Sequence, residues 1–507
     1  MSITTPALAQ NRYKPHPSVL TALRTPRILI REVLAGLVVA LALIPEAISF
    51  SIIAGVDPAV GLFSSFIMAM TISIVGGRPA MISAATGSVA LVIAPVARHY
   101  GMDFFIATVI LAGVFQILLS VVGVAKLMRF IPRSVMIGFV NALAILIFIA
   151  QLPNLIGVPW AVYPLVVAGI AIMVFLPRLT KVVPAPLIAI ILIAAAVVVT
   201  GLSVPTVGGE GALPHSLPSL FIPNVPLTWH TFTTIAPYAL AMALVGILES
   251  LLTAKLVDDI TDTHSNKTRE TWGQGIANIV SGFFGGMGGC AMIGQTMINV
   301  RASGARTRIS TFLAGVFLLI LIVVLHSVVA VIPMAALVAV MVMVSVGTFD
   351  WHSIRPRTLK KMPLGETIVM VATVAIVVAT NNLAIGVVVG VIIAMVIFAK
   401  RVAHFATVDR TISETPEGEE LAHYRVNGEL FFASSNDLTT QFEYAEDPKN
   451  VEIDMSGSHI WDVSTIAALD SITNKYEHHG KTVTITGMND ASAEIHARLA
   501  GNLGREH

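Results

Sequence analysis

The sequence has very little charge and almost no cysteine. Only 12% of its 507 residues are Asp, Glu, Lys or Arg, whereas 55% are hydrophobic and the mean hydropathy is +0.82. This composition excludes an ordinary soluble enzyme and indicates an integral membrane protein. The single cysteine, Cys290, excludes a disulfide framework and a metal site built from thiolates. The net charge of +1 does not indicate a partner.

Motifs for several kinds of chemistry are also absent. There is no Walker motif for ATP hydrolysis, and there is no HExxH motif, CxxC pair or acidic cluster for a metal. No short apolar core precedes a cleavage site near the N-terminus, so we expect no cleaved signal peptide. The sequence therefore predicts no enzyme activity, cofactor, metal site or nucleic-acid partner, and it favours secondary transport.

Long apolar segments follow a polar, basic N-terminal segment (1–31) and fill a predicted transport domain (32–402). With the N-terminus in the cytosol, 21 of the 22 Lys and Arg before Lys400 lie at cytosolic positions, and only Arg98 lies outside. Cytosolic loops are rich in these residues, so we expect a multi-pass inner (plasma) membrane protein with cytoplasmic termini. The fourteen predicted spans are 33–54, 59–75, 82–97, 103–125, 133–151, 160–177, 182–202, 234–257, 270–284, 290–300, 309–331, 333–348, 365–380 and 384–399.

The segment Gly285–Gly304 differs from an ordinary span. Its first half is mostly glycine, and only about ten apolar-compatible residues, Cys290 to Asn299, precede a basic run. A complete span needs about 20 residues, so this segment predicts half a helix. A helix that ends within a membrane must be surrounded by protein or line a wet cavity. Its N-terminal N–H groups then favour an anion.

A second short segment stands at a corresponding position. Met81–Arg98 is the third of the first seven spans, and Gly285–Asn299 is the third of the second seven. Because seven is odd, two such halves have opposite orientations. Short, interrupted segments at matching positions indicate an inverted-repeat transporter with its site between them.

The last part of the chain, 403–507, has a different composition. It carries most of the carboxylates and has no long apolar run. Residues 423–434 predict a hairpin or strand pair, 435–446 a helix, 450–457 a buried strand, 463–480 an amphipathic helix, 481–489 another strand and 493–501 a last helix. This alternation predicts a small cytosolic α/β domain.

Two ionisable residues, Glu46 and Glu249, lie near the centre of predicted spans, and no Lys or Arg does. A charge at mid-bilayer costs about 2.5–3.5 kcal/mol on insertion scales, so we expect each carboxylate to have a functional or structural role that offsets this cost. An anion held here must depend on helix N-termini, hydroxyls and amides. The candidates are Thr86, Gly87 and Ser88 on one side, and the backbone of Cys290, Ala291, Met292 and Ile293 on the other.

Five motifs follow one another along the chain: LALIPEAISFSIIAGVDPAVGLFSSF (41–66), TGSVALVIAP (86–95), GILESLLTAKLVDD (246–259), GGMGGCAMIGQTMINV with GARTR (285–308), and EIDMSGSHIWDVST (452–465). In this order they resemble the SulP family of anion transporters, the sulfate permease, pendrin and prestin group, and the last motif resembles a STAS domain. The resemblance implies seven plus seven inverted repeats forming core and gate domains, an anion site between spans three and ten, and a homodimer.

The resemblance also assigns individual residues. It implies that Phe50 forms a pocket wall and that Gln295 stands where several eukaryotic relatives have Arg. In sodium-coupled relatives, an Asp and a Thr at the positions of Glu249 and Thr253 contribute to a Na⁺ site. Removing a carboxylate from water disfavours its charged form. We therefore expect Glu249, with Glu46, to exchange protons and drive H⁺-coupled uptake of a small anion. The candidate anions are sulfate, bicarbonate and a C4-dicarboxylate such as fumarate.

Alternatives remain open at each position. Glu46 follows Pro45 and could bond the backbone that this proline frees, and Glu249 could be a structural partner of a polar residue in another span. The Thr86 and Ser88 hydroxyls could bond within their own helix, Gln295 could join helices, and Cys290 could be a small apolar residue. Na⁺ symport and exchange compete with H⁺ symport. A membrane anion sensor that signals through its STAS domain is the alternative of another class.

Overall fold

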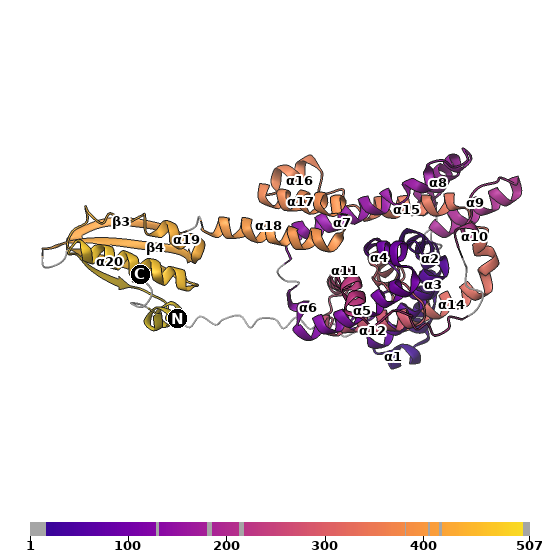
Figure 1. Cartoon of the computed structure of the whole chain (residues 1–507), viewed down its shortest axis with the longest axis horizontal. Coiled ribbons are helices and arrows are strands. Elements are labelled where there is room, and N and C mark those ends of the chain that lie inside the picture. Colours follow the sequence, from indigo (N-terminus) through magenta and orange to yellow (C-terminus); the bar gives the residue numbers. More distant parts are fainter. Residues whose placement is uncertain are drawn as a thin grey trace. The chain divides into compact units, whose positions relative to one another are not determined.

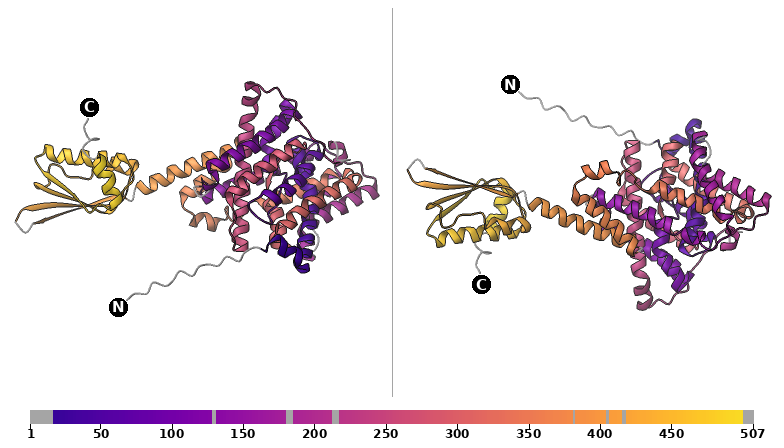
Figure 2. Two further views of the ribbon diagram at one scale, coloured as in Figure 1. Left: turned by 90° about the horizontal axis from the view of Figure 1, so that it is seen from below. Right: turned by 90° about the horizontal axis from the view of Figure 1, so that it is seen from above.

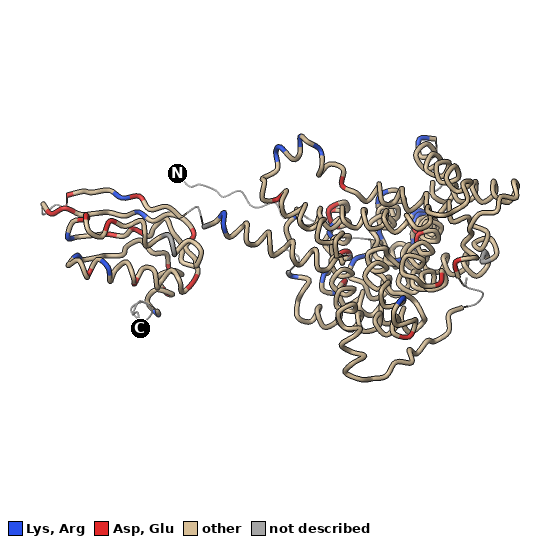
Figure 3. The backbone as a smooth tube through the Cα atoms, turned by 45° about the horizontal axis from the view of Figure 1, so that its top comes forward, with Lys and Arg blue, Asp and Glu red and all other residues tan. Residues whose placement is uncertain are grey.

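The computed structural model describes residues 17–127, 131–179, 185–211, 217–380, 382–403, 406–414 and 418–499. These residues form two compact units that divide at Val391, within α18 (Leu383–Ala403) (Figure 1). Figure 3 shows the long helices of the first unit mostly free of charged residues, whereas acidic and basic residues recur along the second unit. The charge pattern thus separates a membrane unit from a C-terminal unit.

Each of the fourteen predicted spans corresponds to a helix among the described residues. Seven segments of the described chain are long and apolar enough to cross a membrane, and four shorter helices are also apolar. The helices that match the spans are α2 (Pro26–Ala54), α3 (Pro58–Val75), α4 (Gly87–Tyr100), α5 (Met102–Val122), α7 (Arg133–Ile149), α8 (Val162–Leu179), α9 (Ala185–Thr200), α11 (Trp229–Thr261), α12 (Lys267–Phe283), α13 (Ile293–Met297), α14 (Arg308–Ala330), α15 (Met334–Thr348), α17 (Leu364–Thr380) and α18.

Short helices occupy several of the connections. They are α1 (Val19–Arg24), α6 (Val124–Leu127), α10 (Val207–Glu210) and α16 (Pro356–Lys361).

The membrane helices, which Figure 2 shows from opposite sides, pack in two groups. In one group, which we call the core, α5 packs on α11 and α12, α14 packs on α2 and α3, and α4 packs on α2, α5 and α11. In the other, which we call the gate, α7 packs on α15 and α17, and α8 packs on α9 and α15. The groups meet where α2 contacts α9 and α15 and where α4 contacts α7.

Two broken helices meet inside the core. The two-residue strand β1 (Ser83–Ala84) precedes α4, and β2 (Cys290–Ala291) precedes α13. The strands pair antiparallel, with Ser83 opposite Ala291 and Ala84 opposite Cys290. The segment that begins at Gly285 is therefore not a continuous helix, in agreement with the predicted half-helix. After α13 the chain continues as a π-helix (Ile298–Ala302).

Charged residues join the helix ends predicted to face the cytosol. Arg78 Nη1 lies 2.7 Å from Asp258 Oδ1, and Lys267 Nζ lies 2.5 Å from Asp258 Oδ2. The Glu270 carboxylate accepts hydrogen bonds from the backbone N–H groups of Gly77 at 2.7 Å and Arg78 at 3.0 Å. The connections after α3 and α11 thus lie at one end of the membrane unit, which we call the basic end.

The C-terminal unit contains a four-stranded sheet of order β3-β4-β5-β6. Strand β3 (Thr407–Glu414) pairs antiparallel with β4 (Glu420–Leu430), and the remaining pairs are parallel. Its core holds Asp447, whose carboxylate accepts hydrogen bonds from Tyr424 Oη at 2.6 Å and Tyr476 Oη at 2.5 Å. The other elements are β5 (Asn450–Ile460), β6 (Thr482–Thr486), α19 (Phe432–Leu438), α20 (Val463–His478) and α21 (Asp490–Leu499).

Two of the predicted elements in this unit are wrong. The expected hairpin at 423–434 is the single strand β4 followed by the start of α19, and the expected helix at 435–446 ends at Leu438. The helix begins early because the Phe431 carbonyl accepts the backbone N–H groups of Ser434 and Ser435, both at 2.9 Å. The Ser434 hydroxyl also accepts the Phe431 N–H at 2.9 Å, and these bonds turn the chain away from the sheet.

Candidate functional site

A cavity of about 390 Å³ lies at the tips of the two broken helices, between core and gate. The core side is lined by Glu46 and Phe50 of α2, by residues 86–88 at the start of α4, by Glu249 of α11 and by residues 292–294 at the start of α13. The first N–H groups of a helix have no acceptor within it. Both helix starts therefore turn unsatisfied donors toward a partly apolar space.

Glu249 connects the two helix starts. Its side chain lies on α11, and it is 7% exposed. The Ser88 hydroxyl donates a hydrogen bond to Glu249 Oε2, and Cys290 Sγ lies 3.0 Å from the same oxygen. Thr86 Oγ1 lies 3.1 Å from Cys290 Sγ and 3.2 Å from Ser88 Oγ. A single carboxylate thus contacts side chains of both broken helices, which are far apart in the sequence.

A second carboxylate, Glu46, faces the same cavity from α2. The described residues that line the cavity include these two carboxylates but no Lys, Arg or His. An anion in the cavity would therefore meet helix N-termini and hydroxyls as attractive groups, and the two carboxylates as repulsive ones whenever these are ionised.

Buried polar side chains hold the glycine-rich strand in place behind the cavity. Asn278 of α12 accepts the Gly289 N–H at 2.8 Å, and its amide donates to the Gly289 carbonyl at 3.1 Å and to Gln116 Oε1 at 2.9 Å. The Ala291 N–H donates to Ser250 Oγ at 3.1 Å, and the Ser64 hydroxyl donates to the Gly288 carbonyl at 2.6 Å. These bonds satisfy backbone groups that a broken helix leaves free within a membrane.

The predicted site residues occupy two layers. Eight of them line the cavity: Glu46, Phe50, Thr86, Gly87, Ser88, Glu249, Met292 and Ile293. Four lie behind this lining: Cys290, Ala291, Gln295 and Thr253, each at most 1% exposed. Thr253 donates its hydroxyl to the Glu249 carbonyl at 2.8 Å, so this hydroxyl is engaged within α11.

The gate wall was not predicted from the sequence. Its residues are apolar or small and lie in ordinary spans, so no charge, glycine break or motif distinguishes them. The unpredicted lining residues of the gate are Phe139, Val140, Leu143, Ile147, Val344, Gly347 and Thr348, and those of the core are Leu252 and Gly294. Two buried carboxylates, Glu32 and Glu270, were also missed. They accept backbone N–H groups and do not line the cavity.

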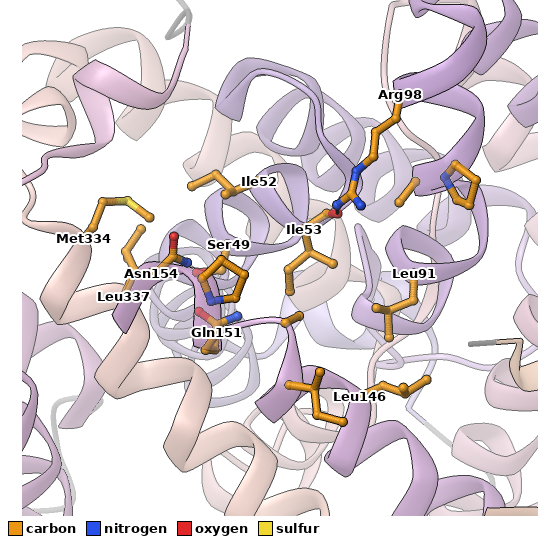
Figure 4. A pocket seen from close by; sticks show the side chains of 15 residues that line it. Ser49, Ile52, Ile53, Leu91, Arg98, Leu146, Gln151, Asn154, Met334 and Leu337 are labelled. Atoms are coloured by element: carbon orange, nitrogen blue, oxygen red, sulfur yellow. Dashed lines mark hydrogen bonds between the residues drawn. The ribbon is translucent and has the colours of Figure 1, made fainter. Parts of the chain in front are cut away.

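A second cavity, of about 490 Å³, lies along the same helices, α2, α4, α7 and α15. It is lined by residues one or two turns further from the basic end, including Ser49, Gln151 and Asn154. Figure 4 shows Arg98 of α4 reaching into it from the side opposite Gln151 and Asn154. Arg98 Nη2 donates to the Ile53 carbonyl at 3.3 Å. We call it the outer cavity, because the sequence predicts that this side of the membrane unit faces away from the cytosol.

Comparisons with known proteins match both units. The sulfate permease family model matches residues 29–167 and 160–373, and the STAS domain model matches 413–503. The candidate sulfate transporter YbaR of Bacillus subtilis (strain 168) is 53% identical over 470 residues, which cover 93% of this chain and 97% of that protein. The bicarbonate transporter BicA of Picosynechococcus is 26% identical over 77% of this chain and 74% of its own length.

Solved structures show the same membrane fold. The transmembrane domain of a cyanobacterial bicarbonate transporter, BicA, matches with a TM-score of 0.61 and 25% identity, covering 73% of this chain and 97% of that one. The murine anion transporter Slc26a9 in an inward-facing state matches with a TM-score of 0.79 and 16% identity, covering 93% of this chain and 87% of that one. This second likeness concerns the fold alone.

Proposed function

Since the chain belongs to the sulfate permease family, a family of multi-pass membrane transporters rather than enzymes, we propose that it takes up a small oxyanion together with protons. The proposed site is the cavity between α4 and α13. The observation that carries this proposal is Glu249, a buried carboxylate that contacts both broken helices in a cavity whose described lining has no cationic side chain.

Protonation would decide whether an anion can enter. Two unit charges 4 Å apart interact by about 4 kcal/mol at an effective dielectric constant of 20. An ionised Glu249 or Glu46 would therefore oppose an anion held at the helix starts. A proton on a carboxyl group removes the repulsion from that group and adds an O–H donor. Anion and proton then cross together at a lower cost in burial of charge.

Sulfate is our first candidate substrate, because the relative that shares 53% identity is named for sulfate. Its oxygens can accept hydrogen bonds from the N–H groups at the starts of α4 and α13 and from the Thr86 hydroxyl. The Ser88 hydroxyl, which donates to Glu249, becomes available as a further donor when Glu249 is protonated. Bicarbonate and a C4-dicarboxylate such as fumarate are the other two candidates, since a cavity of about 390 Å³ can hold any of the three anions.

Na⁺ coupling is the second candidate mechanism. It would need oxygen ligands near Glu249, and the Thr253 hydroxyl at the neighbouring turn already donates to the Glu249 carbonyl. Donating this proton leaves the lone pairs of the Thr253 oxygen available to coordinate Na⁺, so the uptake measurement below is needed to separate the two mechanisms. We also propose that the chain works as a homodimer, with both termini cytoplasmic. Cross-linking of the purified protein in lipid would test the dimer.

The central test is uptake of radiolabelled sulfate into proteoliposomes that contain the full chain. We expect uptake to rise when the outside is made acidic and to be unchanged by a Na⁺ gradient. Glu249→Gln should abolish the response to the pH gradient while keeping sulfate–sulfate counterflow, because the amide is permanently neutral. Asp259→Asn, an exposed carboxylate later on the same helix, is the matched control and should behave as wild type.

Three other outcomes of these uptake measurements would contradict the proposal. Unchanged pH dependence in Glu249→Gln would remove the proposed role of Glu249, and stimulation by a Na⁺ gradient alone would favour Na⁺ symport. Absence of uptake for every anion in a panel of sulfate, bicarbonate, chloride and fumarate would favour the anion sensor that signals through its C-terminal domain.

A further inference from the structure

A third cavity, of about 460 Å³, lies in the gate where α7 begins and where α16 leads into α17. Three cationic side chains line it: Arg133 of α7, and Arg357 and Lys361 of α16. Apolar side chains, among them Ile137 and Met370, complete the wall. This combination of a cationic rim and an apolar floor lies at the ends of membrane helices, where Ile137 is two residues from Phe139 of the proposed transport site on α7.

The cations of this cavity differ from those of the core. In the core, Arg78 and Lys267 pair with Asp258, and Arg308 donates to the Ser73 and Gly76 carbonyls at 2.9 and 2.6 Å. Within the described part of the chain, the side chains of Arg133, Arg357 and Lys361 form no hydrogen bond or ion pair. Three unpaired cations therefore face one cavity.

Acidic residues do not neutralise the cavity. Asp350 and Glu366 also line it, together with His352. Asp350 Oδ1 already accepts the backbone N–H groups of His352 at 3.0 Å and Ser353 at 3.3 Å, so this carboxylate holds the turn between α15 and α16. Glu366 is the remaining carboxylate. The cationic groups outnumber the acidic ones, and most of their donors are free.

Exposed apolar side chains surround the same turn. Trp351 is 51% exposed, Ile354 is 44% exposed and Leu364 is 75% exposed. Trp351 Nε1 donates to the Val346 carbonyl at 2.8 Å, which fixes the ring at the end of α15. Tryptophan is enriched where membrane helices meet the headgroup layer, and basic pockets there bind lipid phosphates.

We propose that this cavity binds the headgroup of an anionic phospholipid. The lipid phosphate lies among Arg133, Arg357 and Lys361, and the acyl chains run along the exposed apolar side chains beside Leu364. A soluble phosphate would use the cations but not Ile137, Met370, Trp351 or Leu364, so the apolar wall favours a lipid. The site would tie α7, α16 and α17 of the gate to one leaflet of the membrane.

The test uses the purified full chain and measures binding of phosphatidylglycerol and phosphatidylcholine by native mass spectrometry. We expect wild type to prefer phosphatidylglycerol. The double variant Arg357→Gln/Lys361→Gln should lower this preference on the order of tenfold. The matched control is Arg355→Gln/Lys360→Gln, which removes the same charge from the same segment at residues that do not line the cavity, and it should keep the preference.

Each other outcome would overturn the proposal. Equal loss in both double variants would indicate a general effect of surface charge, and no loss in either would place the lipid elsewhere. Full displacement of phosphatidylglycerol by soluble glycerol phosphate would indicate a free-phosphate site. A melting temperature measured without added lipid checks that each variant is folded, and Arg133→Gln provides an independent test from another helix.

Discussion

Gly87 lines the central cavity, the one at the tips of the two broken helices, and has little room there for a side chain. A Cβ atom added there would lie 2.9 Å from Phe50 Cε1 and 3.3 Å from Ile147 Cδ1. Phe50 belongs to α2 in the core, whereas Ile147 belongs to α7 in the gate. The absence of a side chain at Gly87 therefore lets core and gate close against each other at the start of α4.

We expect Gly87→Ala to reduce sulfate uptake about tenfold without unfolding the protein, because overpacking costs roughly 1–3 kcal/mol. Adding Phe50→Leu should restore part of the rate by removing the ring that the new methyl group meets. Uptake rates and melting temperatures of the single and double variants would measure this. A double variant no faster than Gly87→Ala would contradict the steric explanation.

Arg98 is a second single residue that we expect to affect uptake, and it lies in the outer cavity. Its charge should attract anions into the cleft before they reach the central cavity, and such steering weakens as ionic strength rises. We expect Arg98→Gln to raise the apparent KM for external sulfate about three- to tenfold with little change in maximal rate. Arg98→Lys should retain most of the effect. An unchanged KM and salt dependence in Arg98→Gln would contradict it.

At the scale of elements, the broken helix of α13 depends on Asn278. This buried side chain satisfies both backbone groups of Gly289. Each buried group left unpaired costs about 1–3 kcal/mol. We expect Asn278→Ala to lower the melting temperature by about 2–5 °C and to impair uptake. Asn154→Ala, in the outer cavity, is the comparison and should leave the melting temperature unchanged.

The sequence predicts the elements of the membrane unit well and their pairing less well. The glycines at 285–289 and the short apolar run after them reveal a break, because a helix needs length to cross a bilayer. The pairing of β1 with β2 carries no such signal, since two residues show no periodicity. The gate wall gives no signal in the sequence either, because Phe139 and Leu143 do not differ from the apolar residues of other spans.

The C-terminal unit shows why the remaining elements were missed. Strand β3 lies at the edge of the sheet, and nearly all of its residues are exposed, so no buried alternation marks it. The start of α19 depends on bonds between Ser434, Ser435 and Phe431 that outweigh the strand propensity of the two phenylalanines. By contrast, the cap of α20 was predictable, and Asp462 Oδ1 accepts the Thr465 N–H at 3.2 Å.

At the scale of the whole molecule, the orientation in the membrane can be tested directly. The only cysteine, Cys290, is 0% exposed, so single introduced cysteines can be labelled on an otherwise unreactive protein. We expect Glu210→Cys to react with an impermeant maleimide from outside the cell and Lys126→Cys to react only in inverted vesicles, because the predicted topology places the basic end in the cytosol. The reverse pattern would invert the proposed topology.

The pairing of Ser83–Ala84 with Cys290–Ala291 has a mechanical consequence. An alanine at Gly289 would place its Cβ 1.9 Å from the Ala84 carbonyl oxygen, so the two strands lie in direct backbone contact with no room for a side chain between them. Glu249 of α11 also contacts Ser88 and Cys290, so we expect the binding residues on α4, α13 and α11 to move together during transport. A cargo would be carried past a stationary wall of α7 and α15, and spin labels placed on α4 and α13 would keep their separation throughout the cycle.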